Sequence, residues 1–247
     1  MEQITYGKKK IKFEIKRGRR KKTVALQIHP NSTVVVLSPY LLGKDRIKEI
    51  LLKRAGWIVQ KQEKIRKLNA EIPKKEFVSG ESFPYIGKEY RLKVIRTNHE
   101  RERLCKLMGG RFYVEISNKL SGKAASESVR KKLIEWYIEQ ATRKINERLK
   151  RYSKLIGKKP EKIIITKQGK RWGSCSHSGV LRFNWKIVMT PISMIDYVVV
   201  HELCHLIIKN HSEKFWNKIG SIIPDYKKKR HWLKENSFLL SELLSHE

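Results

Sequence analysis

The residue types best suited to catalysis lie near the C-terminal end of the chain. There an HExxH motif runs from His201 to His205, and His211 follows six residues later. Residues four apart share one face of an α-helix, so His201 and His205 present two imidazoles to a single metal ion. Glu202 lies about 100° around the helix, where its carboxylate flanks the metal and can act as a base toward a bound water. A catalytic zinc takes three protein ligands, and His211 is the candidate third ligand.

The position of His211 sets a condition on this helix. Six residues along a continuous helix correspond to about 240° of rotation, which would point His211 away from the metal. The helix must therefore end first. Asn210 enters the left-handed conformation readily, which predicts a helix end near Ile208 or Lys209. In the metzincin pattern HExxHxxGxxH a glycine makes this reversal, and the isoleucine at 208 argues against metzincin membership.

The surrounding residues favour a metal site over a chance match to a short motif. Three valines precede His201, and leucine, cysteine and isoleucine surround His205, so we expect the helix to be buried on most sides. Buried histidines and a buried carboxylate are costly unless they are hydrogen-bonded or bound to metal. Cys204 does not share the histidine face and is expected to be a buried apolar residue rather than a ligand.

Length and composition are those of an ordinary globular protein. The chain has 247 residues, of which 40% are apolar, so one or two domains are expected. Three cysteines without a CxxC pair make disulfides unexpected and favour a reducing, cytoplasmic location. The first residues lack the apolar segment of a signal peptide, and no apolar run approaches the roughly 18 residues of a membrane span. No membrane partner is therefore expected.

The net charge of +32 makes polyanions candidate partners. Nucleic acid, bound through a basic surface, is the leading possibility. The alternative is a generally lysine-rich composition, because the excess charge is spread along the chain rather than gathered in one nucleic-acid-binding module. The densest basic runs cover residues 16–22 and 227–230.

Two similar units are expected in the N-terminal half. In the first, β-rich segments at residues 12–16, 23–28 and 33–37 precede a helix over residues 44–68. Gly56 lowers the helix propensity in the middle of this helix. The second has three strands and a long helix, at residues 90–95, 104–108, 111–116 and 126–152. In each unit a strand residue precedes a helix tryptophan by 22 positions, which predicts an internal repeat; the pairs are Val35 with Trp57 and Val114 with Trp136.

The glycine and proline content of residues 77–87 is typical of a connecting loop. A boundary there would give a strand–helix region over residues 1–85 and a second region over residues 86–247, unless the chain is one continuous domain. Further along we expect a buried strand, a loop and a second strand, at residues 163–165, 169–179 and 180–187. Pro191 then precedes the helix that carries the motif.

Three sequence elements in this order resemble the YgjP-like metallopeptidases: RWGSCS at residues 171–176, LRFNW at residues 181–185, and the motif region over residues 198–216. The resemblance covers nearly the whole chain. It implies a zinc-dependent hydrolase, a peptidase of the zincin type similar to the WLM and SprT-like groups, some of which clear proteins attached to DNA. It also implies one zinc per chain held by the three histidines, with Glu202 as catalytic base and a protein or peptide as substrate.

Together these observations predict an α+β fold. A strand-rich N-terminal half with long helices is followed by a zincin-like helical core that carries HExxH on its central helix. Zinc would polarise both a water and the scissile carbonyl, while Glu202 takes the water's proton and delivers it to the leaving amine.

Other interpretations remain open at this point. The protein could be a nucleic-acid-binding module whose zinc is structural or whose peptidase activity is vestigial. Structural zinc is usually closed by four protein ligands, and the absence of an obvious fourth ligand in the sequence favours the enzyme. A third interpretation combines both, with the charge of +32 delivering a protease to DNA-bound proteins.

Five further residues have open roles. Arg171 and Trp172 precede a strand, and an edge strand above a zincin helix could hold an extended substrate, with Arg171 meeting a carbonyl or carboxylate. Equally, Trp172 and Trp185 can be packing aromatics and Arg171 an internal ion-pair partner. Tyr226 and His231 are candidate donors to the oxyanion, or surface residues of a basic tail helix.

Overall fold

The computed structural model describes residues 2–18, 23–29, 31–71, 74–98, 105–167 and 171–244. It divides into two compact units, Met1–Pro73 and Lys74–Glu247. The division falls before the boundary at 85/86 that the loop-like composition suggested, because strand β5 (Ser82–Tyr85) pairs in antiparallel register with β6 (Lys88–Thr97). The expected connector is therefore part of the second unit. Ile86 and Gly87, both with positive φ, form the two-residue turn between these strands.

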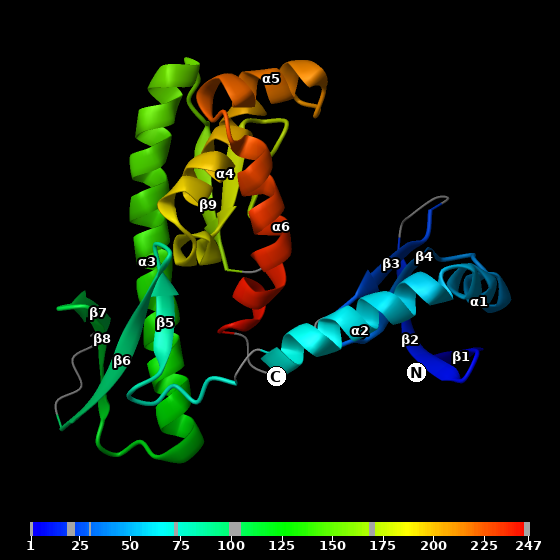
Figure 1. Cartoon of the computed structure of the whole chain (residues 1–247), viewed down its shortest axis with the longest axis horizontal. Coiled ribbons are helices and arrows are strands. Elements are labelled where there is room, and N and C mark those ends of the chain that lie inside the picture. The colour runs from blue at the N-terminus through cyan, green and yellow to red at the C-terminus, as the bar shows by residue number, and fades with distance from the viewer. Residues whose placement is uncertain are drawn as a thin grey trace. The chain divides into compact units, whose positions relative to one another are not determined.

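The first unit is a four-stranded sheet followed by two helices (Figure 1). Its strands β1 to β4 cover Glu2–Tyr6, Lys9–Gly18, Ala25–Ile28 and Val34–Pro39, in the spatial order β1-β2-β4-β3. Strand β1 was not expected from the sequence. The single helix expected over residues 44–68 is two helices, α1 (Lys44–Lys53) and α2 (Ala55–Glu71), because Arg54 leaves helical geometry between them. The break lies two residues before Gly56.

The second unit repeats this topology. Strands β7 (Cys105–Met108) and β8 (Arg111–Ser117) complete a sheet of order β5-β6-β8-β7. In each sheet the two central strands are parallel and each edge strand is antiparallel to its neighbour. A helical segment follows each sheet, with Trp57 in α2 and Trp136 in α3. The predicted internal repeat of strand, turn, strand and helix is thus confirmed.

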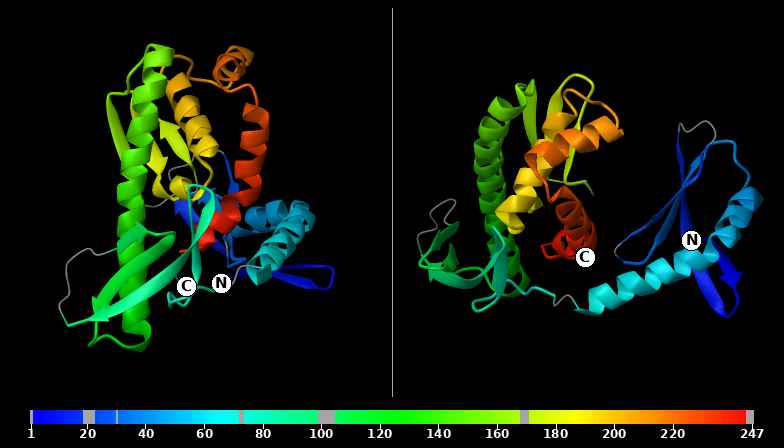
Figure 2. Two further views of the ribbon diagram at one scale, coloured as in Figure 1. Left: turned by 60° about the vertical axis from the view of Figure 1, so that its left-hand side comes forward. Right: turned by 45° about the horizontal axis from the view of Figure 1, so that its top comes forward.

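Helix α3 (Gly122–Ile156) is the longest element of the second unit and extends further at both ends than expected. Its buried residues recur every four positions, from Val129 through Leu133 and Tyr137 to Leu149, so one stripe faces the core along its length. The N-terminal half packs on the sheet, where the rings of Trp136 and Phe112 lie 4.9 Å apart. The C-terminal half packs on the region that carries the HExxH motif (Figures 1 and 2).

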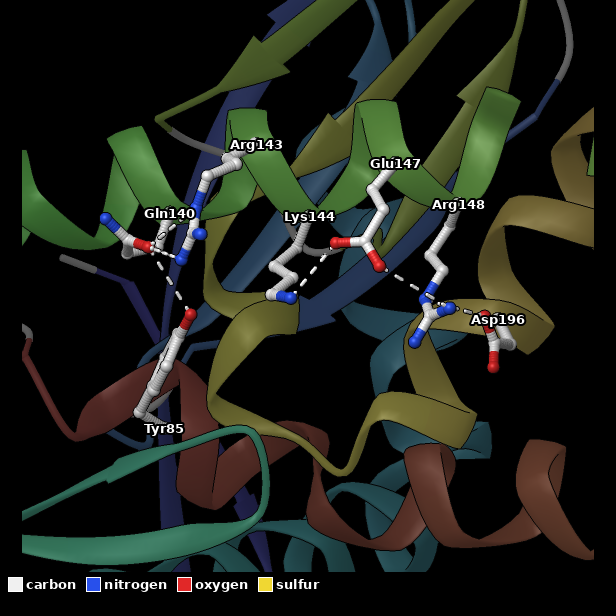
Figure 3. A network of polar contacts seen from close by, with 7 residues as sticks. All are labelled: Tyr85, Gln140, Arg143, Lys144, Glu147, Arg148 and Asp196. Carbon is white, nitrogen blue, oxygen red and sulfur yellow. Dashed lines mark hydrogen bonds and ion pairs between the residues drawn. The ribbon is translucent and has the colours of Figure 1, made fainter. Parts of the chain in front are cut away.

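An ion pair joins α3 to the motif helix. Arg148 Nε lies 3.3 Å from Asp196 Oδ1, and both side chains are largely buried (Figure 3). Burial raises the pKa of Asp196, while Arg148 and Arg151 oppose that rise. On the same side of α3, Glu147 accepts a hydrogen bond from Lys144. The Arg148–Asp196 pair therefore helps to hold the motif helix against the longest element of the fold.

The motif region contains a small sheet and three helices. Strands β9 (Lys162–Thr166), β10 (Gly173–Cys175) and β11 (Val180–Asn184) lie in the order β10-β11-β9, so β10 is an edge strand. Three differences from expectation occur here. Strand β9 is half exposed rather than buried, β10 lies inside the expected loop, and β11 ends at Asn184.

The early end of β11 has a local cause. The Asn184 side chain accepts a hydrogen bond from the backbone N–H of Lys186 and so begins a short 3₁₀ helix, η1 (Trp185–Met189). The helices that follow are α4 (Ile192–Cys204), α5 (Glu213–Ile222) and α6 (Tyr226–Glu242). None of the helices in the described part of the chain is long and apolar enough to span a membrane.

Candidate metal centre

Helix α4 carries the HExxH motif and is buried on most of its surface, as expected. It ends at Cys204, so the chain leaves the helix before His211, as the geometry required. The predicted position of the turn is wrong: the helix ends four or five residues earlier than expected, and Asn210 does not have a positive φ. Instead, the N–H groups of Ile207 and Ile208 both bond to the Cys204 carbonyl, which tightens the turn without a left-handed residue.

The three motif histidines converge on one point. Nε2 of His211 lies 3.1 Å from Nε2 of His201 and 3.2 Å from Nε2 of His205. Three nitrogens bound at 2.0–2.1 Å to one tetrahedral metal lie about 3.4 Å apart, so this spacing fits a divalent metal ion. Among the described residues, only these three histidines, His201, His205 and His211, form a cluster suited to a metal.

Contacts around the imidazoles orient them toward this point. The Ile208 carbonyl lies 3.0 Å from His205 Nδ1; because a carbonyl only accepts, Nδ1 donates and Nε2 keeps the lone pair that a metal requires. His205 also stacks on Phe215, with ring centroids 4.4 Å apart, and His211 stacks on Trp216 at 5.4 Å. The fully buried Phe215 ring contacts all three histidines.

His201 is held neutral. Burial, with smaller contributions from His205 and His211, lowers the pKa of His201 to about 3. Its Nδ1 is buried and has no hydrogen-bond partner among the described residues. Metal ligation needs the neutral form of histidine, so this environment suits a ligand. Cys204, by contrast, is fully buried in the core, where burial raises the pKa of its thiol to about 11, in agreement with its expected apolar role.

Glu202 lies beside the histidines and is 5% exposed. Burial raises the pKa of its carboxyl group to about 8, while Arg171 opposes that rise. Its Oε2 atom is buried and has no hydrogen-bond partner among the described residues. A buried carboxylate oxygen without a partner is costly, and a water held at the histidine cluster would satisfy it. The orphaned oxygen therefore fits a hydrated metal beside it.

Two cavities meet at this point. One of about 420 Å³ is lined by all three histidines and by the β10 residues, and one of about 270 Å³ lies on the other side of Glu202. Four residues line both cavities: Arg171, Gly173, His201 and Glu202. The candidate metal centre therefore lies where two adjoining cavities share a wall formed by these four residues.

The other residues singled out from the sequence have separate places. Arg171 lines both cavities. Trp172 donates from Nε1 to Ser237 Oγ at 3.1 Å and lines the smaller cavity. Trp185 is 2% exposed and packs in the core. Tyr226 stacks on Trp216, and the exposed His231 pairs with Glu235 on α6; neither lines the two cavities.

The lining residues that were not predicted include Gly173, Tyr197 and Arg230. Tyr197 precedes His201 by four positions, so helical spacing could have identified it. Its ring lies 5.8 Å from that of His201 and it is largely buried. Arg230 was noted only as part of a basic run; its guanidinium lies 4.8 Å from the centroid of Trp216. Gly173 gave no signal beyond its place in the RWGSCS segment.

Comparison with known proteins identifies the family of this chain. No curated protein gave a significant match. Among solved structures, the metallopeptidase zymogen of Pyrococcus abyssi abylysin matches 37% of this chain and 93% of its own, with 17% identity and a TM-score of 0.34. The sequence model of the family described as "YgjP-like, metallopeptidase domain" matches residues 22–236. The chain therefore belongs to the YgjP-like metallopeptidase family.

Proposed function

We propose that this protein is a zinc metallopeptidase in which His201, His205 and His211 hold one zinc ion and Glu202 is the general base. The observation that carries the proposal is the convergence of three Nε2 atoms beside a buried carboxylate oxygen that has no partner among the described residues. Three protein ligands leave a fourth position for water, which is the arrangement of catalytic rather than structural zinc sites.

Bound zinc would supply Lewis acidity, which lowers the pKa of water and polarises a carbonyl. Glu202 would take the proton of the attacking water and pass it to the leaving amine. Burial raises the pKa of Glu202 to about 8, and Arg171 opposes that rise, so Arg171 favours the ionised form that the first of these transfers needs. Phe215 and Trp216 hold the ligand imidazoles in place, so the histidines need not reorganise when substrate binds.

The edge strand β10 offers a place for an extended substrate. It pairs only with β11 among the described strands, so its other edge can form main-chain hydrogen bonds with a peptide. Gly173 and Ser174 of this strand line the cavity that contains the three histidines. A peptide added along β10 would therefore pass the candidate zinc, and Arg171, next to the strand, could meet a substrate carbonyl or carboxylate.

The smaller cavity favours an acidic group on the substrate. Arg171, Arg230 and Lys234 line it, and Glu202 is its single acidic residue among the described lining residues. Cations in a concave, partly desolvated site attract anions more strongly than the same charges on an open surface. We therefore expect faster cleavage of peptides that place an acidic side chain or a terminal carboxylate in this cavity.

Metal removal tests the proposal. Wild type stripped with a chelator should lose cleavage of an unfolded protein substrate and regain it when one equivalent of zinc is added. His211→Ala should fail to bind zinc tightly and stay inactive, because it lacks one of three ligands. His231→Ala is the matched control, since His231 is exposed and does not line the cavities. Full cleavage by the stripped protein would overturn the proposal.

A nucleic-acid-directed protease remains a second candidate because the net charge is +32. Cleavage of DNA-bound proteins that is stimulated by DNA and lost at high salt would support it. Equal cleavage of free and DNA-bound substrates at every salt concentration would contradict it.

A further inference from the structure

In the described part of the chain, no residue of the sheet β5-β6-β8-β7 lines the two cavities at the candidate metal centre, so the face of this sheet opposite α3 has no part in that site. Successive side chains of a strand point to opposite faces. Leu92, Phe112 and Val114 belong to the core that includes α3, which lies along one side of the sheet (Figure 2). Their neighbours in sequence, Lys93 and Tyr113, therefore point to the opposite face, and neither belongs to that core.

The register of the strands places four cations on this opposite face. Lys93 on β6, Tyr113 on β8 and Lys106 on β7 are direct cross-strand neighbours and form one row. In the adjacent row, Arg91 lies directly opposite Arg111. The four cations are exposed, and Tyr113 between them is partly exposed. We call these five residues the cationic sheet face.

The charges of this face are not balanced locally. Like charges directly opposite each other destabilise a sheet, as Arg91 and Arg111 must. In the described part of the chain, none of the four cations forms an ion pair or a hydrogen bond through its side chain. Two carboxylates on the same face, Glu89 and Glu115, lie in the rows next to these cations, so four positive charges stand beside two negative ones. Such an arrangement suits an external anion that contacts several cations at once.

Tyr113 adds a second feature. Its ring makes none of the ring–ring or cation–π contacts found among the described aromatic residues, unlike Phe112 beside it, which packs on Trp136. A partly exposed aromatic ring at the centre of a four-stranded sheet, flanked by cations, can stack an unpaired base while the cations contact phosphates. Bases in a duplex are already stacked and cannot use the ring in this way.

We propose that the cationic sheet face binds single-stranded nucleic acid, with a base stacked on Tyr113 and phosphates on Arg91, Lys93, Lys106 and Arg111. The partner follows from chemistry: repeated negative charge matches the cations, and an exposed base face matches the ring. An anionic membrane fits less well, because Met108 is the one large apolar side chain among the described residues of this face that is strongly exposed, at 64%.

The first unit supports this interpretation. Lys10, Lys12 and Lys16, with Glu14 between the last two, alternate with the core residues Ile11 and Phe13 along β2, the strand that corresponds to β6. They therefore lie on the face of the first sheet turned away from its own core. Both copies of the repeat thus present cations on the sheet face opposite their helices, although only the second copy places a tyrosine among them in the described strands.

Binding of a fluorescein-labelled, 20-nucleotide oligodeoxythymidine, followed by anisotropy over a series of salt concentrations, tests the proposal on the full chain. The face variant changes Arg91, Lys93, Lys106 and Arg111 to Gln. Each phosphate that the variant no longer neutralises lowers the slope of log affinity against log salt by about 0.7, so we expect a decrease of about 3. The control variant removes the same amount of charge by changing four exposed lysines on or just beyond α3 to Gln: Lys131, Lys150, Lys154 and Lys158. An equal decrease of the slope in the two variants would overturn the proposal.

Substitutions of Tyr113 provide a second test of the proposal. Tyr113→Leu should weaken oligonucleotide binding about 5- to 100-fold and leave heparin binding unchanged, because only the base uses the ring. Tyr113→Phe keeps the ring and should retain affinity. Unchanged affinity in Tyr113→Leu, or tighter binding to duplex DNA or to phosphatidylserine vesicles than to the single strand, would also overturn the proposal. Circular dichroism and thermal unfolding confirm that each variant is folded.

Discussion

Gly173 lies directly against the carboxyl group of Glu202. A Cβ atom at position 173 would lie 2.6 Å from Glu202 Oε1 and 2.7 Å from its Cγ, closer than real Cβ contacts allow. The backbone of the edge strand β10 therefore forms one wall of the carboxylate site, and only glycine leaves room for it. Glu202 is itself buried, so this contact lies inside the fold rather than on its surface.

Gly173→Ala should displace the Glu202 carboxylate while leaving the histidines in place. We expect the variant to keep its zinc and to lose about 100-fold or more of its peptidase activity, the scale of a misplaced general base. Gly18→Ala is the control, because a Cβ there meets nothing within 4 Å and its φ is ordinary. Zinc content and initial cleavage rates are measured for both variants. Full activity in Gly173→Ala would show that the position of the Glu202 carboxylate is not critical for hydrolysis.

Phe215 should matter for metal affinity beyond its part in the core. Its ring stacks on His205 and contacts His201 and His211, so Phe215→Leu should free the imidazoles and weaken zinc binding about 10- to 100-fold. Phe112→Leu removes a ring that is also fully buried but lies in the β5–β8 sheet, and should leave zinc affinity unchanged. Competition with a zinc chelator measures both. Equal affinities in the two variants would assign Phe215 to packing alone.

Titration of the Glu202 carboxyl group should make the metal-free protein less stable as the pH rises. Burial raises the pKa of Glu202 from 4.5 to about 8, so between these values the folded state keeps a proton that the unfolded chain has lost. Stability from this group is therefore complete below pH 4.5 and is lost as the pH rises through 8. Glu202→Gln stays neutral and avoids this loss.

Thermal unfolding in the presence of a chelator measures this effect. At about pH 8 we expect a Tm for Glu202→Gln that exceeds that of wild type by several degrees, since about 1 kcal/mol corresponds to 2–4 °C in a protein of this size. Near pH 4.5 the difference should disappear. Glu139→Gln, at an exposed site on α3, should follow wild type at both pH values. A Tm difference between Glu202→Gln and wild type that does not change with pH would contradict the raised pKa of Glu202.

Local patterns predicted the fold well where the relevant forces are local. Alternation and turn residues located most strands of both sheets, and the 22-residue spacing of Val35 with Trp57 and of Val114 with Trp136 indicated the repeat. The short strands β1, β5 and β10 were missed because their pairing partners, rather than their own composition, make them strands. The end of α4 was misplaced because a carbonyl that accepts two N–H groups, rather than a left-handed residue, closes the helix.

In the candidate site, too, the sequence predicted the residues that local spacing connects and missed those that only the tertiary structure brings together. The HExxH spacing placed His201, Glu202 and His205 on one helix, and the need to end that helix brought His211 back to the other two histidines. Gly173 and Arg230 reach the cavities from distant parts of the chain. No spacing rule connects a residue of an edge strand or of α6 to a carboxylate on α4, so tertiary structure was needed to find them.

The most direct test of the central proposal compares zinc content with hydrolysis in Glu202→Gln. Both wild type and variant should bind one zinc per chain, measured by metal analysis of the same preparations used for cleavage of an unfolded protein. We expect cleavage by the variant to fall by a factor of about 100 or more, because a glutamine cannot take the water's proton. Glu139→Gln should match wild type in both measurements. Undiminished hydrolysis by zinc-loaded Glu202→Gln would contradict the role of Glu202 as general base.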